Sequence, residues 1–356
     1  MVIGTCGFGS SGSSVISDYL KEFEMFQILD DVEFILPYCP DGLQQLDFVL
    51  NQAPVRNESS YVALFRFEHM VKKILSKGTF VKQSKLNRRE VSNLCDEFLQ
   101  TITQCKWNGF IGTETYTCGN FYRLFGISIM KQRVIPFFEH RTGKMWKKRY
   151  PYHEIRMSVC PSNFDMAAKQ FVNSILCMMG ADNNRNIVLD QPFPGDDPQS
   201  CMKYFDDPIA IVVDRDPRDT YIFLQTRLKN RGAFMPYDNV RDYVKYYRSI
   251  REKRPYSKSK DERVLLIQFE DMIYHYEETT GRLRSFLNLP SNPNPKTIFI
   301  PEMSMANTQL FHRFPDFQKD VKYIEQELED YLYDYSGCPL PKSDAKMFFG
   351  KSPLNR

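Results

Sequence analysis

The chain has 356 residues, of which 42% are hydrophobic and 26% charged, and its formal net charge is +3. This composition is typical of a soluble globular protein with one or two domains, and the small net charge argues against a nucleic acid polymer as partner. The nine cysteines contain no C-x-x-C pair, so neither a disulfide framework nor a zinc site is expected.

No stretch approaches the roughly 20 apolar residues that a membrane span needs, and Met1 leads directly into a strand-like run. We therefore expect no signal peptide, no integral membrane span and a cytoplasmic location. The sequence allows peripheral contact with a lipid-linked molecule, and it does not indicate an oligomeric state. Aromatic residues make up 14% of the chain, which suits either a large aromatic core or an apolar or sugar-stacking cleft.

The chain begins with a predicted strand, a glycine- and serine-rich loop and a predicted helix. Val2–Cys6 is apolar, GFGSSGSS follows from Gly7 to Ser14, and Ser14–Phe23 carries apolar residues at helical spacing. A second strand is expected at Phe26–Leu36. The helices expected next are Asp41–Gln52 (with Asp41 as N-cap), Ser59–Gly78, Val91–Cys105 and Met166–Gly180.

Three further apolar runs end in breaker residues and are typical of buried parallel strands. They are Asn186–Phe193, Ile209–Pro217 and Arg263–Met272. Helical patterns lie between and after them. The sequence therefore predicts an α/β protein with a central parallel sheet flanked by helices.

The Gly/Ser loop reads G-x-x-x-x-G-S-S, one residue away from the phosphate-binding loop G-x-x-x-x-G-K-[ST]. Ser13 stands where that loop has its lysine. Between a strand and a helix, such a loop offers backbone N–H groups and hydroxyls to an anion; the alternative is a turn that binds nothing. The residues expected to bind the anion are Gly9, Ser10, Ser11, Gly12, Ser13 and Ser14.

A second motif, R-D-P-R-D, puts Arg215 and Arg218 at the carboxyl end of a predicted strand. Ligands of open α/β sheets bind at that edge, and two guanidinium groups there suit a phosphate. The alternative is a turn held by ion pairs with Asp214, Asp216 and Asp219.

Together, three motifs in this order resemble the sulfotransferases that use 3′-phosphoadenosine 5′-phosphosulfate. Ser11-Gly12-Ser13-Ser14 resembles the family's S-G-T-T segment, and Arg215-Asp216-Pro217-Arg218-Asp219 matches its R-D-P-R-D letter for letter. The segments Val264–Met272 and Phe286–Pro290 look like the third motif, a strand and the end of the following helix.

The resemblance implies a soluble, bacterial-type member with a P-loop NTPase-like fold, this phosphosulfate as co-substrate and no metal. The Gly/Ser loop would hold the 5′-phosphosulfate, and Arg215 the 3′-phosphate with support from Arg218. Asn307, in a segment that resembles a late S-x-x-N motif, would lie near the cofactor. No lysine is needed at Ser13, because no nucleoside triphosphate with magnesium is bound.

Two positions depart from the family's pattern. Ser10 stands where a lysine or arginine is usual, and Phe223 where a serine usually binds the 3′-phosphate. Thr226, one helical turn beyond Phe223, is a candidate substitute. Another cation must then assist the sulfuryl group, and the candidates are Arg66, Arg141, Lys144 and Lys147.

Sulfuryl transfer to a hydroxyl needs a general base. In several branches of the family it is a glutamate just after the first helix, where Glu33 falls in this chain. Other branches use a later histidine, which makes His69 the second candidate. The structural alternatives are a solvated strand residue for Glu33 and a helix-surface residue for His69.

The resemblance implies one sulfotransferase domain over 1–356. Its cofactor core would be 1–36 and 186–314, its helical acceptor-binding insertion about 37–185, and its C-terminal helix and tail 315–356. The expected acceptor is a hydroxyl on a carbohydrate or glycolipid, with a lipid or steroid alcohol second. A P-loop nucleotide kinase and a catalytically inactive nucleotide-binding protein are the rival functions.

Overall fold

The computed structural model describes residues 1–52, 57–74, 86–109, 134–143, 153–182, 184–229, 235–252 and 261–342. The chain divides into two compact units, described here separately. We call Met1–Ile35 with Gly180–Arg356 the sheet unit, and Leu36–Met179 the helical unit.

The sheet unit is built on five parallel strands in the order β2-β5-β1-β6-β7. The predicted α/β class, with a central parallel sheet flanked by helices, is confirmed. The strands are β1 (Val2–Gly7), β2 (Phe26–Glu33), β5 (Asn186–Asp190), β6 (Pro208–Asp214) and β7 (Val264–Gln268). The central strands β1 and β6 are buried almost throughout, as their continuous apolar runs predict.

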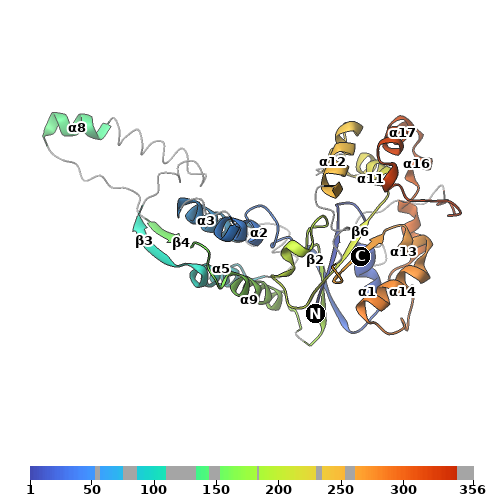
Figure 1. The fold of residues 1–356 in the computed structure, drawn as a ribbon, viewed down its shortest axis with the longest axis horizontal. Helices are drawn as coiled ribbons and strands as arrows, with labels where there is room; N and C mark the ends of the chain where they lie inside the picture. The colour runs from blue at the N-terminus through green and yellow to red at the C-terminus, as the bar shows by residue number, and fades with distance from the viewer. Residues whose placement is uncertain are drawn as a thin grey trace. The chain divides into compact units, whose positions relative to one another are not determined.

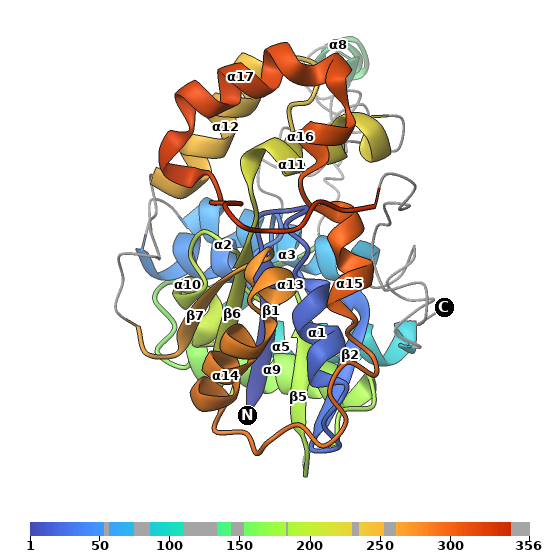
Figure 2. The same ribbon diagram turned by 90° about the vertical axis from the view of Figure 1, so that its right-hand side faces the viewer.

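One face of this sheet is covered by α1, α13 and α14, which lie side by side in Figure 2. Their apolar side chains share one core with Ile3, Val188 and Ile211 of the strands. The helices and turns that follow the strands of this unit are α1 (Ser14–Leu20), α10 (Gln199–Met202), α11 (Pro217–Phe223), η3 (Leu224–Leu228), α12 (Val240–Glu252), α13 (Asp271–Tyr274), α14 (Tyr276–Leu287), α15 (Pro301–Ser304), η5 (Met305–Asn307), α16 (Leu310–Arg313), η6 (Pro315–Phe317), α17 (Gln318–Glu327) and η7 (Glu329–Tyr331).

A second core lies above the carboxyl ends of the strands, where α11, α12, α16 and α17 pack together (Figure 2). It contains Tyr221, Tyr243 and Tyr247, whose rings form a chain of contacts at centroid distances of 5.0 and 5.9 Å. The Tyr243 and Tyr247 hydroxyls donate to the carbonyls of Pro217 and Arg215. This core therefore holds the R-D-P-R-D turn from above.

The helical unit packs α3, α5 and α9 around an aromatic core (Figure 1). The Phe98 ring lies 5.3 Å from that of Phe67 and 5.1 Å from that of Phe171. The described elements of this unit are α2 (Leu43–Asp47), η1 (Phe48–Gln52), α3 (Asn57–Ile74), α5 (Arg88–Ile102), β3 (Cys105–Gly109), α8 (Ile135–Thr142), β4 (His153–Met157) and α9 (Phe164–Met178).

Two predicted helices differ from those observed. The helix expected to be capped by Asp41 instead has Gly42 as its N-cap, because Asp41 adopts a left-handed φ of 62°. The helix expected to reach Cys105 ends at Ile102, and Cys105 opens a strand that pairs antiparallel with β4. The partner strand β4 begins 48 residues further along the chain, so no local sequence pattern predicts the pairing.

Candidate functional site

The two motifs predicted to bind an anion follow adjacent strands. β1 and β6 pair in parallel, with Gly7 opposite Val213, so both strands end at the same edge of the sheet. The chain leaves β1 toward α1 and β2 on one side, and leaves β6 toward α11 and β7 on the other. Such a reversal of direction opens the crevice in which α/β proteins bind ligands.

The Gly/Ser loop has a backbone that requires glycine. Gly9 and Gly12 have φ values of 81° and 83°, in the left-handed region that glycine adopts at little cost. A Cβ at Gly12 would lie 2.5 Å from the Phe269 ring, and one at Gly7 2.1 Å from the Ser11 hydroxyl. The loop is thus tightly packed on the side that faces the protein.

The serine hydroxyls of the loop differ in their hydrogen-bond partners. Ser11 Oγ accepts from the Phe8 N–H at 3.3 Å, and Ser13 Oγ accepts from Gln191 Nε2 at 2.9 Å. Ser10 Oγ is buried and has no hydrogen-bond partner among the described residues. A buried hydroxyl without a partner costs free energy, and an acceptor oxygen bound in the loop would remove that cost.

Arg215 connects the second motif to the loop. Its guanidinium donates to the Ser10 carbonyl at 3.1 Å and to the Asn307 carbonyl. It lies 5.2 and 5.1 Å from the ring centroids of Phe223 and Phe269. Its Nε is buried and has no partner among the residues that the structure describes, so this cation retains a donor for a further acceptor.

Arg218 lies in a different environment. Its guanidinium forms a bidentate pair with the Asp216 carboxylate, with Nη2 to Oδ2 at 2.7 Å, and also pairs with Glu325 at 3.1 Å. It stacks on the Phe311 ring at 4.1 Å. In this structure Arg218 therefore holds the turn together, as the ion-pair alternative expects, while Arg215 is the arginine that reaches the loop.

The other residues of the predicted cofactor site have local partners. The Thr226 hydroxyl of η3 donates to the Ile222 carbonyl of α11, one turn before it, at 2.8 Å. Asn307 is buried, and its carbonyl is an acceptor for Arg215. Phe223, which replaces the serine usual in the family, instead forms one side of the aromatic pair around Arg215.

Glu33 is exposed and is the last residue of β2. An irregularity between Leu29 and Glu33 brings Glu33 beside Asp190, the last residue of β5. Because β5 is the neighbour of β1, Glu33 lies at the same edge of the sheet as the Gly/Ser loop. The loop, Arg215 and Glu33 thus all lie at the carboxyl edge of the sheet, with Glu33 on a strand two places from β1.

His69, Arg66 and Arg141 belong to the helical unit. His69 is exposed on α3 and stacks on the Phe65 ring at 6.0 Å. Arg66 is exposed on the same helix, and Arg141 is exposed on α8. Lys144 and Lys147 lie outside the described residues.

Two residues that the sequence analysis missed contact the loop. Gln191 follows Asp190 and bonds to both ends of the loop, through the Gly7 N–H at 3.2 Å and the Ser13 hydroxyl. Arg251 of α12 pairs with Asp214 at 2.9 Å and lies 4.0 Å from the Phe8 ring centroid. The polar end of the strand Asn186–Phe193 could have identified Gln191, whereas nothing local marks Arg251.

A group of buried carboxyls interacts electrostatically with Arg215. Glu270 is fully buried, and its Oε1 accepts from the Asp216 N–H at 3.0 Å while its Oε2 has no partner among the described residues. Burial, together with the nearby Asp216, raises the pKa of Glu270 well above its usual range and that of Asp219 to about 6. No group of three or more His, Cys, Asp or Glu in the described ranges is arranged to hold a metal ion.

The segment after α17 crosses this edge of the sheet (Figure 2). The Tyr333 N–H donates to Asp216 at 3.0 Å, and its carbonyl accepts from Arg218 at 3.2 Å. The Tyr335 hydroxyl donates to Asp219 at 2.6 Å, and its oxygen lies 3.2 Å from Oε1 of Glu270. Asp219 also accepts from the N–H groups of Gln309 and Leu310 at 2.8 and 2.6 Å, so these contacts add to partners that the buried carboxyls already have.

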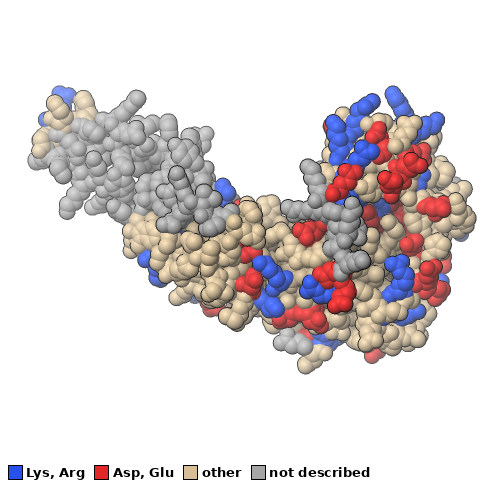
Figure 3. Space-filling model, in the orientation of Figure 1, with Lys and Arg blue, Asp and Glu red and all other residues tan. Residues whose placement is uncertain are grey.

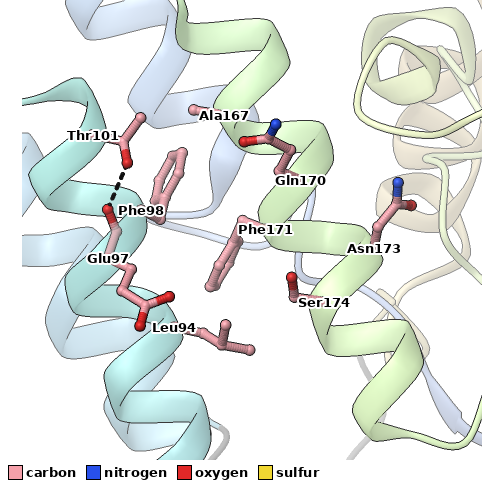
Figure 4. Close-up of a pocket in the computed structure, with 9 residues that line it drawn as sticks. All are labelled: Leu94, Glu97, Phe98, Thr101, Ala167, Gln170, Phe171, Asn173 and Ser174. Carbon is pink, nitrogen blue, oxygen red and sulfur yellow. Dashed lines mark hydrogen bonds between the residues drawn. The ribbon is translucent and has the colours of Figure 1, made fainter.

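The helical unit contains a hollow of 450 Å³ between α5 and α9 (Figure 4). The rings of Phe98 and Phe171 lie between the two helices, and among the described residues Glu97 is the one ionisable residue that lines the hollow. The hydroxyls of Thr101 and Ser174 also line it, but its lining holds no histidine or second carboxylate among the described residues that could act as their base.

The described surface carries charges of both signs. On the face drawn in Figure 3, acidic and basic side chains are interspersed over the sheet unit, in keeping with the net charge of +3. No helix within the described residues is long and apolar enough to cross a bilayer.

No protein-family model matches the chain, and no curated protein matches it. Among solved structures, it is similar to a sulfotransferase domain from the curacin biosynthetic pathway, with a TM-score of 0.36 and 14% identity. The match covers 82% of this chain and 75% of that one. A likeness at this TM-score establishes neither family nor activity, so the function is argued from the site.

The buried Glu270 makes stability depend on pH. Because its pKa is raised above the ordinary value of 4.5, the folded state keeps a proton that the unfolded chain releases. The free energy of unfolding therefore falls as pH rises from about 4.5 through the raised pKa. In Glu270→Gln, which stays neutral, this fall should be smaller. Urea unfolding at about pH 5 and about pH 8 measures it.

Glu278→Gln, at an exposed residue of α14, is the control, and equal pH dependence in all three proteins would contradict the assignment.

Proposed function

We propose that the protein transfers a sulfuryl group from 3′-phosphoadenosine 5′-phosphosulfate to an acceptor hydroxyl. The observation that carries the proposal is the hydrogen bond from the Arg215 guanidinium to the Ser10 carbonyl. It joins the Gly/Ser loop to the R-D-P-R-D turn, and the sequence resemblance assigns these two motifs to opposite ends of the same nucleotide.

The residues of this edge suit a phosphosulfate. The loop supplies backbone N–H groups and hydroxyls, and the orphaned Ser10 Oγ and Arg215 Nε are donors that await an acceptor. Held donors of this kind stabilise charge that develops on the leaving phosphate and fix the in-line geometry of transfer. Glu33, at the same edge, would take the proton from the acceptor hydroxyl.

The proposed acceptor is a carbohydrate or glycolipid hydroxyl, with a lipid or steroid alcohol as the second class. The aromatic content of 14% suits both, because sugar rings and apolar rings each pack on aromatic side chains. Turnover on a panel that holds both classes would also separate an enzyme from a nucleotide-binding protein without activity.

One observation supports a kinase as the second candidate. Asp190 ends β5, the strand beside β1, and a P-loop kinase needs an acidic magnesium ligand on a neighbouring strand. The same loop has Ser13 in place of the lysine that reaches the β- and γ-phosphates. A sulfuryl donor fits this loop better, since it requires neither that lysine nor the metal.

Adenosine 3′,5′-bisphosphate should stabilise the protein in the absence of metal. At a hundredfold excess over its dissociation constant, the gain should be about 2.7 kcal/mol. Thermal unfolding with the bisphosphate, and separately with ATP and magnesium, measures it. A shift with ATP and magnesium but none with the bisphosphate would favour the kinase and overturn the proposal.

Arg215→Ala should weaken binding of the bisphosphate about ten- to a hundredfold, the worth of a charge-assisted hydrogen bond. Arg215→Lys should recover part of the affinity, because lysine lacks the planar fork of donors. Titration calorimetry compares them with Arg263→Ala, which removes the same charge from an exposed pair with Asp261. Wild-type affinity in Arg215→Ala would show that Arg215 has only a structural role.

Glu33→Gln should lower turnover about a hundredfold or more, the usual contribution of a general base. Bisphosphate affinity should stay the same, because Glu33 is assigned to the acceptor. Glu24→Gln, an exposed glutamate just before the amino end of β2, is the matched control. Loss of turnover in His69→Asn, with normal turnover in Glu33→Gln, would move the role to the histidine.

A further inference from the structure

We infer that Gln191 is a positioning residue of the Gly/Ser loop, which keeps the Ser13 hydroxyl turned as a hydrogen-bond donor toward an anionic group bound there. The inference deepens the proposed function, and it rests on that function only in requiring a phosphate or sulfate in the loop. It names a residue 178 positions from Ser13 in the chain.

Gln191 occupies a constrained position at the edge of the sheet. It follows the last residue of β5, adopts a left-handed φ of 52°, and its N–H donates to the Thr5 carbonyl of β1 at 2.9 Å. A left-handed conformation is uncommon for a residue with a side chain. This backbone directs its amide to both ends of the loop, Gly7 and Ser13.

The two partners determine which way the amide faces. A backbone N–H can only donate, so the atom that meets the Gly7 N–H at 3.2 Å must be the carbonyl oxygen of the side chain. The amide nitrogen then meets Ser13 Oγ at 2.9 Å. That nitrogen can only donate, and Ser13 must therefore accept from it.

A serine hydroxyl has one proton and two lone pairs. Because Ser13 accepts from Gln191, its proton points elsewhere, and it donates to no described residue. Ser13 is 8% exposed, so this donor is largely shielded from water. An oxygen of phosphate or sulfate, which carries only acceptors, matches that donor.

A carboxylate at position 191 would reverse the arrangement. An ionised glutamate can only accept, so it would draw the Ser13 proton toward itself and leave the loop without that donor. It would also place a negative charge beside the anion. Glutamine, which has nearly the same shape, supplies one acceptor and one donor without a charge.

The experiment measures binding of inorganic sulfate and of adenosine 3′,5′-bisphosphate by calorimetry. Gln191→Glu should weaken both ligands at pH 8 by about tenfold or more, the scale of a lost hydrogen bond to a charged group. The matched control is Gln27→Glu. Gln27 also bridges two backbone groups, the Gly180 carbonyl and the Asp182 N–H, but it lies at the amino end of β2. Its variant should bind as wild type does.

The pH dependence separates this role from a merely structural one. A protonated glutamate has one donor and one acceptor again, so sulfate affinity of Gln191→Glu should recover toward the wild-type value as pH falls to about 4, below the ordinary pKa of glutamate. Sulfate keeps its charge over this range. A loss of affinity that is the same at both pH values would overturn the inference.

A second pair of variants tests the route through Ser13. Gln191→Met should weaken sulfate binding in the wild-type background and have little further effect in Ser13→Ala, because both remove the same oriented donor. Additive losses would contradict the inference.

If sulfate responds as expected and the bisphosphate does not bind, the inference holds and the proposed function fails; if wild type binds neither ligand, both fail.

Discussion

The site depends on one buried cation. The Arg215 guanidinium lies between the rings of Phe223 and Phe269 and donates to carbonyls from two segments that follow different strands. A guanidinium that is removed from water needs acceptors and countercharges, and here it finds the Ser10 and Asn307 carbonyls and a group of buried carboxyls. Because Arg215 is shielded from water, it needs acceptors from the loop and negative charge from the buried carboxyls at the same time. It therefore links the Gly/Ser loop, the R-D-P-R-D turn and these carboxyls.

The segment that follows α17 adds hydrogen bonds to these carboxyls. Asp216 and Asp219 accept from the Tyr333 N–H and the Tyr335 hydroxyl, and their partners include Arg218, which the sequence analysis assigned to the nucleotide. Asp216 lies two residues from Arg218 and forms two hydrogen bonds with it. The buried Arg218 therefore pairs with this carboxylate rather than with an anion from solution. The two arginines of one motif thus have different roles.

The sequence predicted what local patterns encode: the apolar strands, the parallel sheet, the Gly/Ser loop and the turn after β6. It could not predict that Arg215 rather than Arg218 contacts the loop, since both precede an aspartate. Gln191 and Arg251 were not predicted as site residues, for a different reason. Each contacts the loop across a long separation in the chain, and their neighbours in sequence resemble ordinary strand-end and helix residues. The strand pairing of β3 with β4 was hidden in the same way.

The crossing segment at Tyr333 and Tyr335 also bears on how the protein is made. Domains generally begin to fold during synthesis, from the N-terminus onward. Here β1 and its loop are synthesised before the rest of the sheet, yet the contacts of Asp216 with Tyr333 and of Asp219 with Tyr335 cannot form until the chain has been synthesised as far as those tyrosines. These hydrogen bonds at the carboxyl edge of the sheet can therefore form only late in synthesis, after the helices that pack above that edge have been made.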